Sequence, residues 1–137
     1  MCGIAGFLNF NQAPASRELI QQMTRVIAHR GPDGEELYVS STIALGHRRL
    51  AIIDLSTAGK QPMCNEDGTI WITYNGEIYN FAETRLELEA RGHHFRSHTD
   101  TEVVIHAYEE WGVKCLTRFN GMFAFALWNK KNRTLFL

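Results

Sequence analysis

The order of its apolar segments constrains the fold of this chain more than any other feature. Strand-like runs and helical patterns follow one another without regular alternation, and no internal repeat is present. A doubly wound parallel sheet requires such an alternation, so the order favours a layered α+β domain. With 137 residues and 45% hydrophobic content, the chain has room for one domain with a core.

Three elements are predicted in the first half of the chain. The apolar run 4–10 predicts a strand that begins almost at residue 2. Residues 17–29 carry apolar side chains at helical spacing, with Ser16 as the capping residue, and predict an amphipathic helix. The stretch 42–54 is apolar and β-branched at both ends, but it contains the cation Arg49, which such a strand does not explain.

Residues 69–74 alternate in a way that predicts another strand, with Ile70, Ile72 and Tyr74 on one face. We expect it to break into a turn at Asn75-Gly76, because Asn-Gly is a strong hairpin signal. A second hairpin is predicted from the apolar runs 122–128 and 133–137.

Two capping-box patterns predict two more helices between these strands. Asn80 with Glu83 starts the first, Thr99 with Glu102 starts the second, and each helix ends at a glycine. Asp100 therefore lies in the first turn of the second helix.

Charge and hydropathy limit the classes of partner. The net charge is −1, from 14 basic and 15 acidic residues without a block of one sign, which argues against nucleic acid. No apolar stretch approaches the roughly 20 residues of a membrane span, and the N-terminus lacks the features of a signal peptide. We therefore expect a soluble, cytoplasmic protein.

Cys64, Cys115 and the histidines near position 95 do not predict a metal site. Cys64 and Cys115 lack a C-x-x-C spacing and are expected to be small buried hydrophobes. His93, His94 and His98 have no carboxylate or cysteine that completes a recognised ligand spacing.

Cys2 is the strongest candidate for chemistry. Initiator methionine is normally removed before a small second residue, and removal of Met1 would give Cys2 a free α-amino group. Such an amine titrates near pH 7.7 to 8.0 and can accept a thiol proton without a catalytic histidine. The alternative, that Cys2 is simply the second residue of a strand, loses weight in view of the residues that follow it.

Motifs along the whole chain support the first interpretation. The N-terminal run Met1-Cys2-Gly3-Ile4-Ala5-Gly6 resembles the start of class II, N-terminal-nucleophile glutamine amidotransferases, above all those of the asparagine synthetase type. The further motifs similar to that family are Arg30-Gly31-Pro32-Asp33-Gly34, His47-Arg48-Arg49-Leu50-Ala51-Ile52-Ile53-Asp54, Gln61-Pro62, Tyr74-Asn75-Gly76-Glu77-Ile78-Tyr79-Asn80 and Thr99-Asp100-Thr101-Glu102. The resemblance implies a four-layer αββα sandwich of two antiparallel sheets. It also implies that residues 1–137 are one glutaminase domain, incomplete at its C-terminus.

The resemblance also implies roles for individual residues. It implies Cys2 as nucleophile, Asn75 and Gly76 as the oxyanion hole, and Arg49 as the group that holds the glutamine α-carboxylate. The implied substrate-binding positions are Arg49, Leu50, Ile52, Ile53, Asn75, Glu77 and Asp100, with Asp100 as ligand of the substrate ammonium. Alternatives remain open: Asn75-Gly76 as a plain turn, and Asp100 as a residue that stabilises its helix.

The implied activity is hydrolysis of L-glutamine through a thioester on Cys2, with transfer of ammonia to a synthetase domain. That domain would use ATP and Mg²⁺ to amidate aspartate, whereas no cofactor is expected in residues 1–137. A homodimer of the full-length protein is expected. The alternatives are an amidotransferase with another acceptor, or a folded module without catalytic activity.

Overall fold

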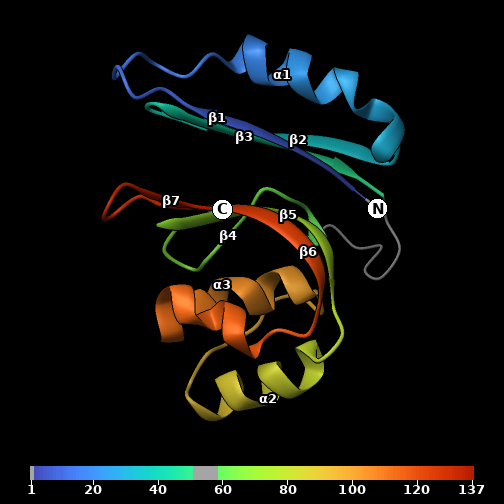
Figure 1. Cartoon of the computed structure of the whole chain (residues 1–137), viewed down its shortest axis with the longest axis vertical. Helices are drawn as coiled ribbons and strands as arrows, with labels where there is room; N and C mark the ends of the chain where they lie inside the picture. Colours follow the sequence, from blue (N-terminus) through green and yellow to red (C-terminus); the bar gives the residue numbers. More distant parts are fainter. Residues whose placement is uncertain (1, 51–58) are drawn as a thin grey trace.

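A computed structural model describes residues 2–50 and 59–137 of the chain, which form four layers (Figure 1). In chain order the elements are β1 (Gly3–Leu8), α1 (Arg17–Val26), the 3₁₀ helix η1 (Ala28–Arg30), β2 (Gly34–Ser40), β3 (Ile43–Arg49), β4 (Met63–Cys64), β5 (Ile70–Ile78), α2 (Phe81–Ala90), α3 (Asp100–Trp111), the 3₁₀ helix η3 (Gly112–Arg118), β6 (Gly121–Asn129) and β7 (Thr134–Phe136). Helix α1 covers one sheet, and α3 with α2 covers the other. The predicted αββα sandwich is confirmed.

Each sheet is built from one continuous part of the described chain. The first has the strand order β1-β3-β2, and the second has the order β4-β5-β6-β7. All of the neighbouring strands in both sheets are antiparallel. The first sheet thus uses residues before position 50, and the second uses residues after position 59.

Helix α1 follows its predicted start but ends earlier than expected. The Ser16 hydroxyl accepts a hydrogen bond from the Leu19 amide at 3.1 Å, as the capping pattern requires. The buried side chains Ile20 and Thr24 face the first sheet at Gly46, where a Cβ atom would lie only 2.5 Å from the Thr24 methyl group. Glycine at this position therefore lets α1 pack closely on the sheet.

The two sheets pack face to face through large side chains. Ile43 and Leu45 from β3 form a buried cluster with Trp128 from β6. Tyr38 on β2 stacks on Trp71 on β5, with ring centroids 3.9 Å apart. These contacts hold the sheets together by removing apolar surface from water.

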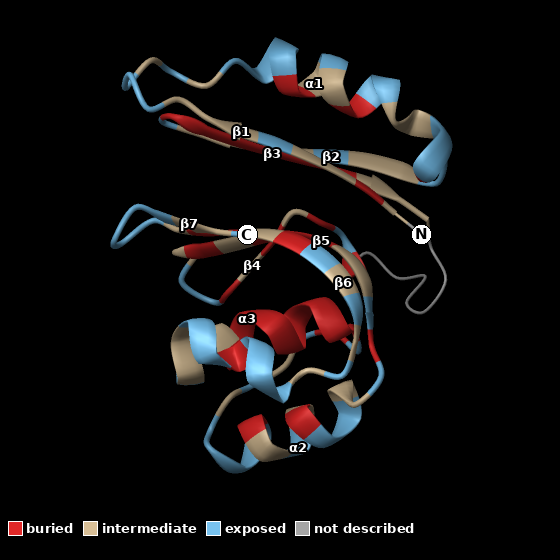
Figure 2. Cartoon of the chain, viewed as in Figure 1, coloured by how far each residue is buried: buried red, intermediate tan, exposed pale blue. Residues whose placement is uncertain are grey.

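Helix α3 is the most deeply buried helix, because it lies between the second sheet and α2 (Figure 2). Val104 and Ile105 pack against Ile72 and Tyr74 of β5. The apolar face predicted for β5 is therefore confirmed. It is the face that packs against the helices. Among the described helices, none has the length and apolar character that crossing a bilayer would need.

The turn predicted at Asn75-Gly76 is wrong, because β5 continues through both residues to Ile78. Asn75 pairs with Ala124 of β6, and Gly76 pairs with Phe123. Pairing along the whole of β6 stabilises the extended backbone more than a local turn would. No strand was predicted for β2, where the charged pair Glu35 and Glu36 obscures the alternation.

The two predicted capping boxes have different outcomes. Thr99 caps α3, since its hydroxyl accepts a hydrogen bond from the Glu102 amide at 3.3 Å. The Asn80 side chain makes no capping bond to α2 within the described residues. It donates to the Arg118 carbonyl and accepts from the Asn120 amide, both at 2.9 Å, and so joins the start of α2 to the start of β6.

The two other cysteines differ in exposure. Cys115 is fully buried, as predicted, and burial raises the pKa of its thiol to about 11. Cys64 lies at the end of the short strand β4 and is only half-buried, so the prediction is wrong there. The predicted hairpin of β6 and β7 is confirmed.

Candidate active site

Cys2 lies immediately before β1, at the edge of the space between the sheets. Because Gly3 pairs with Arg48, the chain direction brings Cys2 beside the end of β3. The Cys2 Sγ atom lies 3.4 Å from the Leu50 amide nitrogen and 3.7 Å from the Leu50 carbonyl oxygen. The sulfur therefore lies against the Leu50 backbone, where it accepts from the amide and its thiol donates to the carbonyl.

Arg49 is placed by the alternation of β3. Ile43 and Leu45 face the other sheet, and side chains two residues apart in a strand share a face, so His47 and Arg49 also face it. A groove of about 170 Å³ at this point is lined by Arg49, His47, Asp33 and other residues. The cation that the strand pattern did not explain thus lies where the sheet opens into a groove.

Asn75 faces the same interior space from the second sheet. Trp71 stacks on a residue of the first sheet, and Thr73 bonds to it, so alternation directs Asn75 the same way. The Asn75 Oδ1 atom is buried and has no hydrogen-bond partner among the described residues. Most buried polar atoms do have one, so the accepting oxygen of this amide is unpaired, whereas its Nδ2 group is the part that could donate to an anion.

Two hydrogen bonds fix how the sheets lie against each other. The Thr73 hydroxyl donates to the Gly46 carbonyl at 3.1 Å, and the His47 Nε2 atom lies 3.2 Å from the Tyr74 carbonyl oxygen. Burial is the main cause that lowers the pKa of His47, to about 4, so the ring is neutral and donates its Nε2 proton.

These two bonds also show which ends of the strands coincide. The first bond joins Gly46 to Thr73, and the second joins the next residue of each strand, His47 to Tyr74. The strands β3 and β5 therefore run in the same direction here. The end of β3 that carries Arg49 therefore lies at the end of β5 that carries Asn75. The chain N-terminus lies at this end of the sandwich as well (Figure 1).

Gly76 is required by the close approach of β6. A Cβ atom at this position would lie 2.4 Å from the Met122 carbonyl oxygen and 2.5 Å from the Phe123 Cα atom. Any larger residue would push the two central strands of the sheet apart. Glycine here preserves the strand that carries Asn75.

Asp100 approaches β5 from its helix-facing side. Its Oδ2 atom accepts hydrogen bonds from the Tyr74 hydroxyl at 2.7 Å and from the Ile78 amide at 3.1 Å. Burial and then the charge of Asp100 raise the pKa of Tyr74 well above its ordinary value, so its hydroxyl stays a donor. Since Tyr74 faces the helices, Asp100 lies across β5 from Asn75.

Gln61 is a buried connector to which the sequence assigned no role. Its Oε1 atom accepts a hydrogen bond from the Tyr74 amide at 2.6 Å, and its Nε2 atom donates to the Thr101 hydroxyl at 3.1 Å. It thus joins β5 to the first turn of α3, next to Asp100. The signal for Gln61 in the sequence is the motif Gln61-Pro62, one of those that resemble the amidotransferase family.

The predicted site residues fall into three groups. Cys2, Arg49, Leu50 and Asn75 lie at the same end of the sandwich, where the Cys2 sulfur contacts the Leu50 backbone and Arg49 and Asn75 face the space between the sheets. Gly76 and the exposed Glu77 continue β5 beyond them, and Asp100 lies on the other side of that strand. Two predicted positions, Ile52 and Ile53, lie outside the described residues.

The first group has the parts for nucleophilic attack on an amide. A half-buried thiol lies beside a backbone amide, a guanidinium suits a carboxylate, and the N–H donors of a side-chain amide suit a developing oxyanion. An amino acid with a side-chain amide would match each of these features.

Comparison with known proteins agrees with this geometry. The family model described as "Glutamine amidotransferase domain" matches residues 1–137, which is the whole chain. A relative named asparagine synthetase [glutamine-hydrolyzing] 1, from Bacillus subtilis (strain 168), is 43% identical over 139 residues. That alignment covers 99% of this chain and 22% of the relative.

A second relative is named probable asparagine synthetase [glutamine-hydrolyzing], from Dictyostelium discoideum. It is 44% identical over 133 residues, which cover 96% of this chain and 24% of the relative. The chain therefore spans about a quarter or less of the length of these curated relatives.

Solved structures support the fold. The structure titled glutamine phosphoribosylpyrophosphate (PRPP) amidotransferase from B. subtilis, complexed with ADP and GMP, matches with a TM-score of 0.56 at 24% identity. The structure titled as the allosteric regulatory enzyme of purine biosynthesis matches with a TM-score of 0.58 at 25% identity. Each match covers 67% of this chain and 22% of the other. From the family match over its whole length and its relatives at more than 40% identity, the chain belongs to the glutamine amidotransferase domain family.

Proposed function

We propose that this chain is the glutaminase part of a glutamine-hydrolysing asparagine synthetase, with Cys2 as its nucleophile. The observation that carries the proposal is the position of the Cys2 sulfur, 3.4 Å from the Leu50 amide. Arg49 and Asn75 share that end of the sandwich and that interior face. The names of the relatives support the choice of asparagine synthetase within the family.

The proposed reaction consumes glutamine and water and gives glutamate and ammonia. Once Met1 is removed, the α-amine of Cys2 takes the thiol proton, and the thiolate attacks the side-chain amide carbon. A carbon–sulfur bond forms, the amide carbon–nitrogen bond breaks, and ammonia leaves with the transferred proton. Water then attacks the thioester, which releases glutamate and restores the thiol.

Each remaining residue has a role in this scheme. The Asn75 side chain and the Gly76 amide stabilise the oxyanion, and such donors act most strongly where charge develops. Arg49 holds the α-carboxylate through its planar fork. Asp100 holds the substrate ammonium, with Glu77 beside it. Because Asp100 lies on the helix-facing side of β5, its carboxylate must reach around that strand to the substrate. We also propose Leu50, Ile52 and Ile53 as substrate-binding positions.

The released ammonia passes to a synthetase domain that amidates aspartate with ATP and Mg²⁺. This partner is proposed from the names of relatives of which the chain spans 22% and 24%. We also propose that the protein works in the cytoplasm, since a catalytic thiol must remain reduced.

Two alternatives make different products. An amidotransferase with another acceptor would hydrolyse glutamine by the same residues but would form no asparagine. A folded module without catalytic activity would release no glutamate at all.

The test uses the full-length protein and its Cys2→Ala variant, with Cys64→Ala as the matched cysteine control. We expect Cys2→Ala to abolish glutamine-dependent asparagine formation while synthesis from added ammonia persists. Cys64→Ala should retain both activities. Glutamine-dependent synthesis that survives in Cys2→Ala would refute the assignment of the nucleophile. Glutamate release without asparagine would favour another acceptor.

A further inference from the structure

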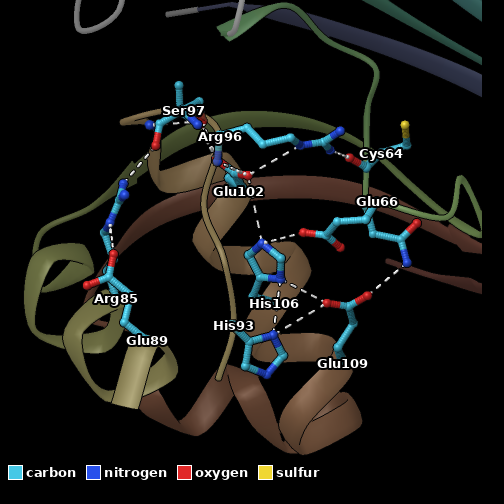
Figure 3. A network of polar contacts seen from close by, with 12 residues as sticks. Cys64, Glu66, Arg85, Glu89, His93, Arg96, Ser97, Glu102, His106 and Glu109 are labelled. Atoms are coloured by element: carbon cyan, nitrogen blue, oxygen red, sulfur yellow. Dashed lines mark hydrogen bonds and ion pairs between the residues drawn. The ribbon is translucent and has the colours of Figure 1, made fainter. Parts of the chain in front are cut away.

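A cluster of titratable side chains lies away from the proposed active site, between the segment that follows α2 and the C-terminal half of α3. Figure 3 shows His93, His106 and Glu109 directed toward one another. The Nδ1 atoms of the two histidines are 3.2 Å apart. The Glu109 Oε2 atom lies 2.9 Å from His106 Nδ1 and 3.7 Å from His93 Nδ1. Three donor atoms thus form a compact triangle.

The size of this triangle suits a metal ion. The circle through the three donor atoms has a radius of about 1.9 Å, and zinc lies roughly 2.0 to 2.1 Å from imidazole nitrogen and roughly 2.0 to 2.2 Å from carboxylate oxygen. An ion at that distance from all three donors would lie just outside their plane. A fourth ligand could then complete a tetrahedron.

The orientation of the two imidazole rings gives independent support. Their centroids are 5.0 Å apart, while their Nδ1 atoms are 3.2 Å apart, so the rings converge on the nitrogen side. If both ring axes meet at one atom, these separations place it about 2 Å from each nitrogen, at an angle of about 100°. Both values are close to tetrahedral zinc geometry.

The far side of each ligand is also held. His93 Nε2 lies 3.2 Å from a Glu110 oxygen, and His106 Nε2 lies 3.6 Å from Glu66 and 3.8 Å from Glu102. Histidine ligands of metals usually direct their second ring nitrogen at such a partner, which fixes ring orientation and raises basicity.

The third donor is fixed in the same way. The Glu109 Oε1 atom accepts a hydrogen bond from Asn65 at 2.8 Å, which leaves Oε2 for the histidines. Phe95 packs edge-on against the His106 ring, with centroids 4.5 Å apart. The donors are therefore oriented before any ion binds.

We propose that His93, His106 and Glu109 bind one Zn²⁺ ion, with water as the fourth ligand. Two imidazoles and one carboxylate are an established zinc ligand set with an open fourth position. A groove of about 570 Å³, lined by Glu109, Glu66 and Asn65 among others, gives water and the ion access.

This site departs from the expectation that the chain binds no metal. The sequence pattern offered His93, His94 and His98, which are close in sequence but do not share a site. The fold instead combines His93 with two residues one helical turn apart on α3, and one of them, His106, is buried.

The ion would join the segment between α2 and α3 to α3 itself. Figure 3 shows how the cluster continues through Glu102, whose carboxylate accepts hydrogen bonds from the Arg96 and Ser97 amides. A bound ion would therefore stabilise the segment that leads into the first turn of α3.

The test is a calorimetric titration of the metal-free full-length protein with Zn²⁺. Every sample carries Cys2→Ala, so that the thiol does not compete for zinc. We expect one Zn²⁺ to bind per chain. In His93→Ala and in Glu109→Gln, binding should be lost or the affinity should fall by about 100-fold or more, because loss of a ligand should cost at least as much as loss of a residue that only supports a ligand. His94→Ala is the matched control, because it removes an exposed histidine next to the site and should leave the affinity unchanged.

Coordination is read separately from the absorption of Co²⁺-loaded protein. Four-coordinate Co²⁺ absorbs visible light strongly, and this band should be present in the His94→Ala control and absent in Glu109→Gln. A protonated His106 paired with carboxylates would explain the same short contacts without a metal. In that case no Zn²⁺ would bind, or His93→Ala and His94→Ala would bind it equally, and either result would overturn the proposal. If His93→Ala fails to fold by circular dichroism, the isosteric Glu109→Gln variant decides.

Discussion

The Tyr74 hydroxyl donates a 2.7 Å hydrogen bond to Asp100 Oδ2, and this bond joins the central strand of the second sheet to the first turn of α3. Tyr74→Phe removes only the hydroxyl. We expect it to lower the free energy of unfolding by about 1 to 3 kcal/mol, because a buried carboxylate oxygen loses a partner. We also expect a higher KM for glutamine in the full-length enzyme.

Tyr79→Phe is the control for this prediction, since Tyr79 is 55% exposed. Denaturant unfolding and glutaminase kinetics are measured on both variants. A Tyr74→Phe variant with the KM of Tyr79→Phe would show that Asp100 does not depend on Tyr74 for its function.

Arg49→Lys should raise the KM for glutamine far more than it lowers kcat. A lysine ammonium is a point charge and cannot replace a planar fork that binds both oxygens of the α-carboxylate. Arg48→Lys is the neighbouring control, because alternation directs that side chain toward α1 instead. An unchanged KM in Arg49→Lys would remove Arg49 from the substrate pocket.

Asn75→Ala should lower the glutaminase kcat by about 10² to 10³, the usual loss for one oxyanion donor. Asparagine formation from added ammonia should persist, because that step does not use the thioester. The exposed hairpin residue Asn132, changed to alanine, provides the control. Equal loss of the glutamine-dependent and ammonia-dependent activities would point to misfolding rather than to an oxyanion hole.

Retention of Met1 should abolish glutamine hydrolysis. With Met1 attached, the Cys2 nitrogen is an amide and cannot accept the thiol proton, and the extra residue would occupy space next to the nucleophile. Mass spectrometry identifies the processed and retained forms, and a glutaminase assay compares them. Comparable glutamate release from the retained form would defeat the N-terminal-nucleophile mechanism.

His47 should make stability depend on pH. Its pKa is about 4 in the folded chain, mainly because of burial, against an ordinary value of 6.5. The neutral ring therefore contributes stability that is complete above pH 6.5 and is lost as the pH falls toward 4. The shift corresponds to about 3 kcal/mol over that window.

His47→Gln keeps a donor for the Tyr74 carbonyl but does not titrate, so its unfolding free energy should fall less steeply between pH 6.5 and 4. His94→Gln changes an exposed ring and should follow the wild-type slope. Urea unfolding at several pH values gives the three slopes. Identical slopes for His47→Gln and wild type would exclude His47 as the titrating group.

Local patterns in the sequence predicted most helices and strands. They failed where pairing with residues distant in the sequence determines the backbone conformation. Ser16 and Thr99 cap their helices as expected, because capping depends on residues within one turn. Asn75-Gly76 forms no turn, because its backbone pairs with β6, some 48 residues further along the chain. The site residues themselves came from a resemblance to a family. Their shared position came only from the structure, since it depends on bonds such as that from Thr73 to Gly46 between the sheets.

Each sheet is made from one continuous stretch of chain, and this has a consequence for synthesis on the ribosome. Once Arg49 has emerged, all of the strands that the structure describes in the first sheet, and the helix that covers it, are available to fold. The apolar side chains of Ile43 and Leu45 then face water until Trp128 arrives. The nascent chain therefore exposes the apolar inner face of the first sheet for the time needed to translate about 80 further residues. We expect chaperone binding to prevent aggregation most effectively at this intermediate length.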